Sequence, residues 1–272
     1  SPSYLGALNA FNAYQPKFVE VPTDNGGLIP EELDKILEST PNCKFIYVIP
    51  DFQNPTGRTW SMERRQKFME VVNKHNLPVL EDNPYGELRY EGTILPSLKS
   101  MDTKGLVMFL GTFSKIFCPG LRLGWIAAEH SLLSEFVKIK QSADLHTSNF
   151  DQGVADAYME QYDLDEHVKE IVALYKHRRD LILESMEKYF PAGTEWTHPE
   201  GGLFLWLTFP EGVSARKVFN KCIEMKVAGV IGDAFYPNQK TDRSMRINYS
   251  NMPDNRIVEG IQRMAKAIKE CM

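Results

Sequence analysis

The sequence predicts an α/β protein, with a large domain built on a mostly parallel sheet and a small α+β domain after it. Up to about residue 190, short apolar runs rich in β-branched residues alternate with amphipathic helical segments. This alternation is typical of parallel strands joined by crossover helices. After Pro191 the pattern changes to that of a compact α+β unit. We therefore expect a large domain over residues 1–180 and a small domain over residues 181–272.

The strands of the large domain are expected where short apolar runs are bounded by turn residues. They cover residues 45–49, 77–81, 106–110 and 123–128. Helices are expected over residues 61–75, 131–142, 152–161 and 166–189. In the longest helix, Ile171, Leu174, Leu181 and Ile182 recur at helical spacing, which indicates one buried face.

The small domain is expected to combine three strands with two helices. The strands cover residues 203–209, 227–231 and 245–249, and a helix covers residues 214–225. The final helix begins near Pro253, a residue that is favoured at helix starts. Its apolar stripe consists of Ile257, Ile261, Met264, Ala265 and Ile268.

Composition excludes several classes of function. A formal charge of −5 argues against binding to nucleic acid or to an anionic membrane surface. The four cysteines form no C-x-x-C pair and the six histidines have no metal-ligand spacing, so we expect a reducing cytoplasm and no metal site. Apolar runs are strand-sized, so we expect no membrane span.

A lysine with anion-binding neighbours follows the third predicted strand. Lys115 lies just after Thr112 and Ser114, and Arg122 comes a few residues later. A lysine in this position can form an imine with an aldehyde, while the hydroxyls and the guanidinium hold a phosphate dianion. Taken alone, the Ser-Lys pair is more typical of an exposed loop.

Two further groups follow the first and second predicted strands. Asn54 opens an Asn-Pro-Thr-Gly turn, a sequence that serves turn geometry in most proteins. Asp82 and Tyr85 follow the strand at residues 77–81. A carboxylate at the end of a buried strand is costly unless a cationic group meets it.

Together these residues match the needs of pyridoxal 5′-phosphate (PLP). PLP presents an aldehyde, a phosphate, a phenolic oxygen and a pyridine nitrogen, and it acts as an electron sink while that nitrogen stays protonated. A lysine, hydroxyls with an arginine, an asparagine with a tyrosine, and an aspartate meet these four needs. All follow predicted strands, where open α/β sheets bind ligands.

The combined motifs resemble those of fold-type I PLP enzymes of the class I/II aminotransferase group. They are NPTG, DNPYGEL, FSK with PGLRLGW, PEGGLFLW and MRINYS. The nearest resemblance is to the branch with 2-aminoadipate aminotransferases and the aminotransferase-like domains of bacterial regulators. It extends over nearly the whole chain and implies the aspartate aminotransferase-like fold of PLP-dependent transferases.

The resemblance also implies a role for each motif residue. Lys115 would bind the cofactor aldehyde and move the proton at the substrate Cα, and Asp82 would pair with the pyridine nitrogen. Arg246 would bind the substrate α-carboxylate through a bidentate pair, a geometry that lysine cannot reproduce. The remaining cofactor contacts would be Asn54 and Tyr85 to the 3′ oxygen, Thr112, Ser114 and Arg122 to the phosphate, and Tyr4 stacked on the ring.

The expected activity is therefore transfer of an amino group between an L-amino acid and a 2-oxo acid, by a homodimer. Two alternatives use the same residues: a PLP- or amino-acid-sensing domain of a transcriptional regulator, and a PLP-dependent β-lyase or decarboxylase. Family members carry a long segment ahead of the position of Ser1, so we expect this chain to be N-terminally truncated. That segment would supply backbone amides to the phosphate.

Overall fold

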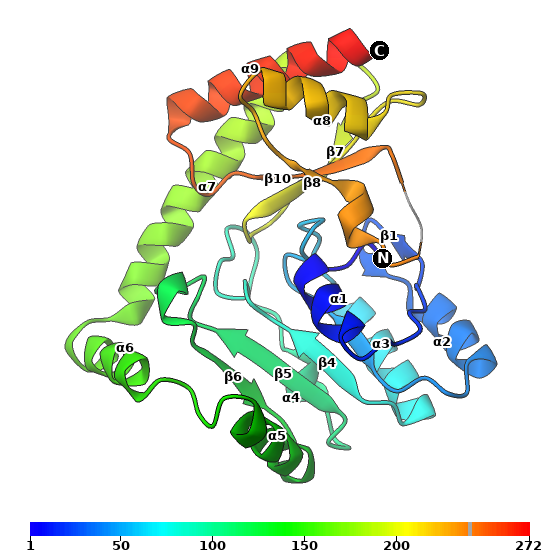
Figure 1. The fold of residues 1–272 in the computed structure, drawn as a ribbon, viewed down its shortest axis with the longest axis vertical. Coiled ribbons are helices and arrows are strands. Elements are labelled where there is room, and N and C mark those ends of the chain that lie inside the picture. Colours follow the sequence, from blue (N-terminus) through cyan, green and yellow to red (C-terminus); the bar gives the residue numbers. More distant parts are fainter. Residues whose placement is uncertain (239–240) are drawn as a thin grey trace.

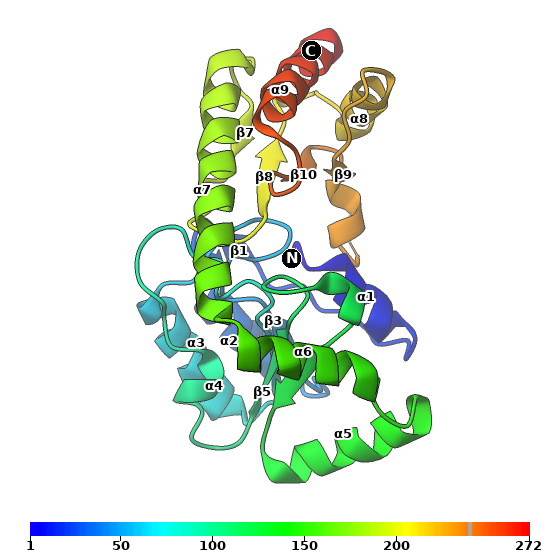
Figure 2. The ribbon, with the colours of Figure 1, turned by 90° about the vertical axis from the view of Figure 1, so that its left-hand side faces the viewer.

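The computed structural model describes residues 1–238 and 241–272 and has two bodies, each built around a four-stranded sheet (Figure 1). The long helix α7 (Leu164–Tyr189) runs along one side and connects them (Figure 2). This helix is continuous through residue 180, where the sequence led us to expect the domain boundary. A continuous helix marks no boundary at that position, so the expected boundary stays a prediction. None of the helices in the described residues is both long and apolar enough to cross a bilayer.

The lower sheet has the strand order β3-β4-β5-β6. Strands β3 (Ile46–Val48), β4 (Val79–Asp82) and β5 (Val107–Thr112) are parallel, whereas β6 (Gly124–Ala127) is antiparallel to β5. The mostly parallel α/β sheet predicted from the sequence is confirmed. A crossover helix between the third and fourth strands is absent from the described chain, because the connection holds only the short turn η1 (Pro119–Leu121). Without a crossover the chain must return antiparallel.

Helices cover the lower sheet and bury its core. The helices α2 (Pro30–Ser39), α3 (Met62–His75) and α4 (Leu98–Met101) pack in this body. The core they share includes Leu33, Phe68, Val72, Val79, Leu98 and Val107. By contrast, α5 (His130–Ala143) and α6 (Asn149–Gln161) leave nearly all their residues solvent-accessible.

The N-terminal elements were not predicted from the sequence. They are α1 (Leu5–Asn12) and the small hairpin β1 (Thr23–Asp24) and β2 (Gly27–Leu28). The helices α2 and α4 were missed as well.

The upper body contains an antiparallel sheet of order β7-β8-β10-β9. Its strands are β7 (Glu195–Trp196), β8 (Phe204–Thr208), β9 (Val230–Ile231) and β10 (Ser244–Asn248). The helices α8 (Ala215–Glu224) and α9 (Asp254–Cys271) pack on it with α7, and the turn η2 (Gly232–Phe235) follows β9. The strands and helices expected here are confirmed, with β7 in addition.

A buried ion pair fixes the loop that follows β3. The Arg65 guanidinium on α3 donates to Asp51 Oδ1 at 2.7 Å, and the two side chains are 0% and 6% exposed. Arg89 also donates to Asp51, and it reaches Glu200 of the upper body. Charges buried this deeply are tolerated only when they are paired, so Asp51 anchors the start of the Asn54 loop.

Replacing Asp51 tests this anchor. The Asp51→Asn variant leaves the Arg65 charge buried without its anion, and we expect the free energy of unfolding to fall by about 3 kcal/mol. Urea denaturation followed by circular dichroism measures the change. The control is Glu135→Gln, which breaks an exposed pair with Lys138 and is expected to cost less than about 1 kcal/mol. Equal effects of the two substitutions would contradict the assignment.

Candidate functional site

Three strand ends meet at one edge of the lower sheet. Because β3, β4 and β5 are parallel and in register, the loops carrying Asn54, Asp82–Tyr85 and Thr112–Lys115 leave the sheet on the same side. The carboxyl edge of an open α/β sheet is the usual place for a ligand. The upper body contributes β10 with Arg246.

The two neighbouring carboxylates at the end of β4 have different partners. Glu81 is fully buried and accepts from the backbone N–H groups of Leu98 and Lys99, at the start of α4. Asp82 points to the other face, where its Oδ2 accepts from the Tyr47 hydroxyl at 2.6 Å. Burial raises the pKa of Asp82, and the Tyr47 hydrogen bond opposes that rise. Among the described residues, no cation pairs with Asp82, whose one side-chain partner is Tyr47.

A hydrogen-bonded chain joins the upper body to the lower one. Arg246 Nη1 donates to Asn54 Oδ1 at 2.8 Å, and Asn54 Nδ2 donates to the Tyr85 hydroxyl at 3.3 Å. The Asn54 loop approaches β8 closely at Gly57, where φ is +71° and a Cβ would lie 2.5 Å from the Phe204 carbonyl oxygen. A glycine is therefore required at this contact.

The Arg246 guanidinium lies between two aromatic rings. Its Cζ is 4.1 Å from the ring centroid of Phe204 and 5.1 Å from that of Phe235. Its Nε is buried and has no hydrogen-bond partner among the described residues. Such an unmet donor is costly, and a carboxylate that accepts from Nε and a terminal nitrogen together would satisfy it.

Lys115 is a partly buried amine in a positive environment. Burial lowers its pKa, and the nearby charges of Arg122 and Arg246 lower it further. A lowered pKa increases the fraction of neutral amine, which is the nucleophilic form.

The candidate phosphate ligands differ in how far their side chains are already used in hydrogen bonds within the protein. The Thr112 hydroxyl donates to the Leu123 carbonyl at 3.0 Å and accepts from the Ser114 backbone N–H, so it holds the loop in place. Arg122 Nη1 donates to Ser114 Oγ at 3.4 Å and to the Pro119 carbonyl. Arg122 adopts a left-handed conformation with φ of 57°, which is uncommon for a residue other than glycine. Ser114 and the exposed Arg122 are thus the freer anion ligands.

Tyr4, at the start of α1, lies near Tyr85 and Arg246. Burial raises the pKa of Tyr85 and lowers that of Arg246, and Tyr4 adds a smaller electrostatic effect on each. Its side chain is 37% exposed, so its ring remains available to a ligand. The predicted residues therefore gather around one edge of the sheet.

Comparison with known proteins identifies the family. The model of the family "Aminotransferase class I and II" matches residues 1–264. The chain belongs to this family. The resemblance recognised in the sequence motifs is confirmed, and the structures of relatives confirm the aspartate aminotransferase-like fold.

Three relatives show how far the similarity extends. Aromatic-amino-acid aminotransferase 1 of Thermococcus litoralis is 43% identical over all of this chain, and the 2-aminoadipate transaminase of Thermus thermophilus is 32% identical over 99% of it. The solved kynurenine aminotransferase of Pyrococcus horikoshii has a TM-score of 0.95 at 41% identity, covering 99% of this chain and 68% of that one. The chain spans 66% and 68% of the two curated relatives.

The candidate site residues of this chain have the chemistry needed to bind PLP. Asp82 is a partly buried carboxylate without a cation in the described residues, and a protonated pyridine nitrogen would supply one. Asn54 and Tyr85 offer donors to a phenolic oxygen. No group of three or more metal-ligating side chains lies together in residues 1–238 and 241–272.

Sequence reasoning missed three side chains of this site. Tyr47 contacts Asp82, and Phe204 and Phe235 flank Arg246. Phe204 also meets Tyr85 edge-on at 6.0 Å. Burial along Phe204–Thr208 does not alternate, so no local pattern in this strand pointed to a ring beside Arg246.

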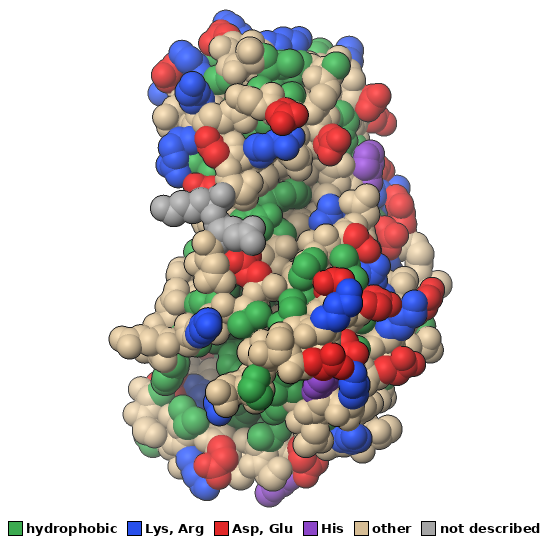
Figure 3. All heavy atoms as spheres, turned by 90° about the vertical axis from the view of Figure 1, so that its right-hand side faces the viewer, with side chains coloured by type: hydrophobic (Ala, Val, Ile, Leu, Met, Phe, Trp, Pro, Cys, Tyr) green, Lys and Arg blue, Asp and Glu red, His purple; other side chains and the backbone are tan. Residues whose placement is uncertain are grey.

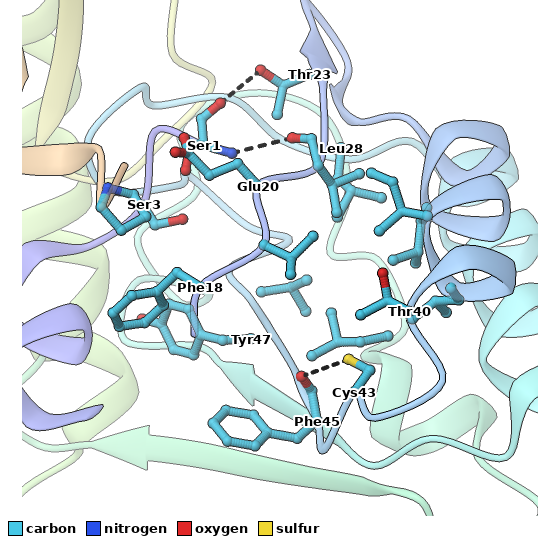
Figure 4. Close-up of a pocket in the computed structure, with 18 of the residues that line it drawn as sticks. Ser1, Ser3, Phe18, Glu20, Thr23, Leu28, Thr40, Cys43, Phe45 and Tyr47 are labelled. Carbon is cyan, nitrogen blue, oxygen red and sulfur yellow. Dashed lines mark hydrogen bonds between the residues drawn. The ribbon is translucent and has the colours of Figure 1, made fainter. Parts of the chain in front are cut away.

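A large cavity lies away from these residues, mainly in the lower body. Its volume is about 710 Å³, and Lys115, Asp82 and Arg246 are not among its lining residues. Residues 16–21, α2 and β3 line it, and Figure 4 shows Phe18, Phe45 and Tyr47 along its wall. Apolar side chains are exposed over the lower body on the face shown in Figure 3. The lining of this cavity is mainly apolar, and none of the nine candidate site residues belongs to it.

The charge of Arg122 is expected to influence Lys115. In the Arg122→Gln variant one repelling charge is lost, so the pKa of Lys115 rises and less neutral amine is present at a given pH. The measurement is an NMR pH titration of ¹³C-methylated lysine at low salt, compared with Arg216→Gln as a remote exposed control. A Lys115 pKa that stays constant or falls would contradict this electrostatic picture.

Proposed function

We propose that this protein is a PLP-dependent aminotransferase, which moves an amino group between an L-amino acid and a 2-oxo acid. The observation that carries the proposal is the convergence of an amine of lowered pKa, Lys115, with an arginine whose Nε is unmet, Arg246. An α-amino acid carries its amine and its carboxylate on the same carbon, the Cα. A site for both groups beside a reactive lysine suits chemistry at the Cα.

In this proposal each site residue has its own chemical role. When bound, PLP supplies an electron sink for the negative charge that develops at the substrate Cα. Asp82 would pair with the pyridine nitrogen and favour its protonated form, and Asn54 and Tyr85 would hold the 3′ oxygen. Arg246 fixes the α-carboxylate and so orients the Cα–H bond, from which Lys115 removes the proton.

The remaining contacts anchor the cofactor. Ser114 and Arg122 bind the phosphate, and Thr112 holds the loop that carries both Ser114 and Lys115. Tyr4, at the start of α1, would supply an aromatic face to the cofactor ring. This assignment keeps all nine residues in the proposed site, with Thr112 acting mainly through the loop.

The choice among PLP activities follows from the relatives. A sensing domain and a β-lyase would use the same residues, so the geometry alone does not separate them. The similar proteins named above are aminotransferases for aromatic amino acids, 2-aminoadipate and kynurenine. We therefore favour aminotransfer, with aromatic and long acidic amino acids as the first substrates to test.

We also propose a homodimer in the cytoplasm. Apolar side chains on β6, α5 and α6 are exposed, among them Trp125, Ile139 and Phe150, and such a surface suits a partner subunit. All four cysteines are free thiols, which suits a reducing compartment.

Loss of Lys115 tests the activity. Intact protein loaded with PLP should convert some members of an L-amino acid panel to 2-oxo acids, and Lys115→Ala should slow this by about 10³-fold or more, since it removes the proton carrier. Lys138→Ala is the control, because Lys138 is an exposed lysine on α5. Turnover by wild type that is unaffected by Lys115→Ala would refute the assignment, and elimination products would favour the lyase.

Arg246→Lys tests the substrate contact. Lysine keeps the charge but loses the bidentate geometry, so we expect kcat/KM for the amino acid to fall by about 10- to 100-fold with little change in PLP affinity. Single-turnover kinetics and a PLP titration measure the two quantities. Equal losses in both would remove Arg246 from the substrate site.

A further inference from the structure

Tyr47 is a partly buried phenol that the proposed chemistry does not yet use. We propose that Tyr47 is a positioning residue for the cofactor, whose hydroxyl holds the Asp82 carboxylate in place. The inference rests on the proposed function, because Asp82 must face a pyridine nitrogen for this to matter. The observation behind it is the 2.6 Å hydrogen bond from the Tyr47 hydroxyl to Asp82 Oδ2.

The register of the sheet explains how Tyr47 reaches Asp82. Tyr47 on β3 pairs with Leu80 on β4, and paired residues point to the same face. Asp82 lies two residues beyond Leu80 and so shares that face. The long phenol ring spans the diagonal to the neighbouring strand. Glu81 points to the opposite face and is held by α4, so the two carboxylates do not compete for Tyr47.

The Tyr47 ring is held on its other side by α1. Phe11 meets the Tyr47 ring edge-on at 5.5 Å and the Phe45 ring at 5.2 Å. Figure 4 shows Tyr47 among the residues that line the large cavity. A ring fixed by packing presents its hydroxyl at a defined point, which is what a positioning residue requires.

The hydroxyl is a donor throughout the physiological pH range. Burial raises the pKa of Tyr47 well above its usual value, and Asp82 raises it further, with smaller effects of Tyr85 and Tyr4. Tyr47 therefore keeps its proton and Asp82 is the partner that titrates. The nearby ionisable groups are Tyr4, Tyr85 and, beyond Tyr85, Arg246.

The bond has a chemical consequence for Asp82. Burial favours the protonated carboxyl, whereas a donated hydrogen bond favours the carboxylate. With Oδ2 occupied by Tyr47, Oδ1 has no hydrogen bond within the described residues and is left for the pyridine nitrogen. Without the hydroxyl, Asp82 takes up a proton more readily and becomes a weaker partner for a protonated pyridine.

The Tyr47→Phe variant tests the proposal, because it removes the hydroxyl and keeps the ring that packs on Phe11. In the protein without cofactor, ¹³C NMR of the Asp82 carboxyl should show a raised pKa. With ¹⁵N-labelled PLP, the ring nitrogen should lose its proton at lower pH than in wild type. PLP affinity and kcat should fall about 10- to 100-fold, with KM for the amino acid nearly constant.

The control is Tyr14→Phe, at a tyrosine that is 85% exposed, and it should match wild type in every measurement. Incorporation of 3-fluorotyrosine at position 47 restores the donor and should restore the ring-nitrogen signal. If Tyr47→Phe leaves the Asp82 titration and the ¹⁵N profile unchanged, the proposal is wrong even where the enzyme is active. If wild type binds PLP but transfers no amino group, the proposed function fails, and the two NMR titrations still decide the role of Tyr47.

Discussion

The hydrogen-bonded chain from Arg246 through Asn54 to Tyr85 is the contact on which the candidate site depends. It joins β10 of the upper body to the loops that follow β3 and β4. Both Asn54 groups are used, one as acceptor and one as donor, so its side chain has a single satisfied orientation. The buried Asp51 carboxylate, held by Arg65, fixes the same loop from below. The proposed substrate and cofactor contacts are thereby held in fixed positions relative to each other, although they come from different sheets.

The site carries electrostatic costs that a ligand would relieve. Asp82 is a partly buried carboxylate with a neutral donor, Arg246 has an unmet Nε, and Lys115 is an amine of lowered pKa. Each is unfavourable in a folded protein, and together they complement a pyridinium, a carboxylate and an aldehyde. Unmet polar groups that converge at one place are typical of functional sites, where stability is given up for binding.

The sequence predicted the local parts of this arrangement better than the long-range ones. Strand ends followed by Asn54, Asp82 and Lys115 were recognisable, because apolar runs and turn residues are local signals. The antiparallel direction of β6 could not be predicted, because the sequence indicates a strand but not how the preceding connection crosses the sheet. The helix α2 was missed although Pro30, Glu31 and Glu32 are typical of a helix start. Tyr47, Phe204 and Phe235 join the site through register and packing between distant segments, which no local pattern reveals.

The central claim is that one amine, Lys115, meets the cofactor at this edge of the sheet. The most direct measurement is to load the intact protein with PLP, reduce it with borohydride, digest it and locate the added phosphopyridoxyl mass by peptide mass spectrometry. The account predicts a single modified lysine at position 115. Label spread over the exposed lysines, or concentrated on a different one, would contradict it.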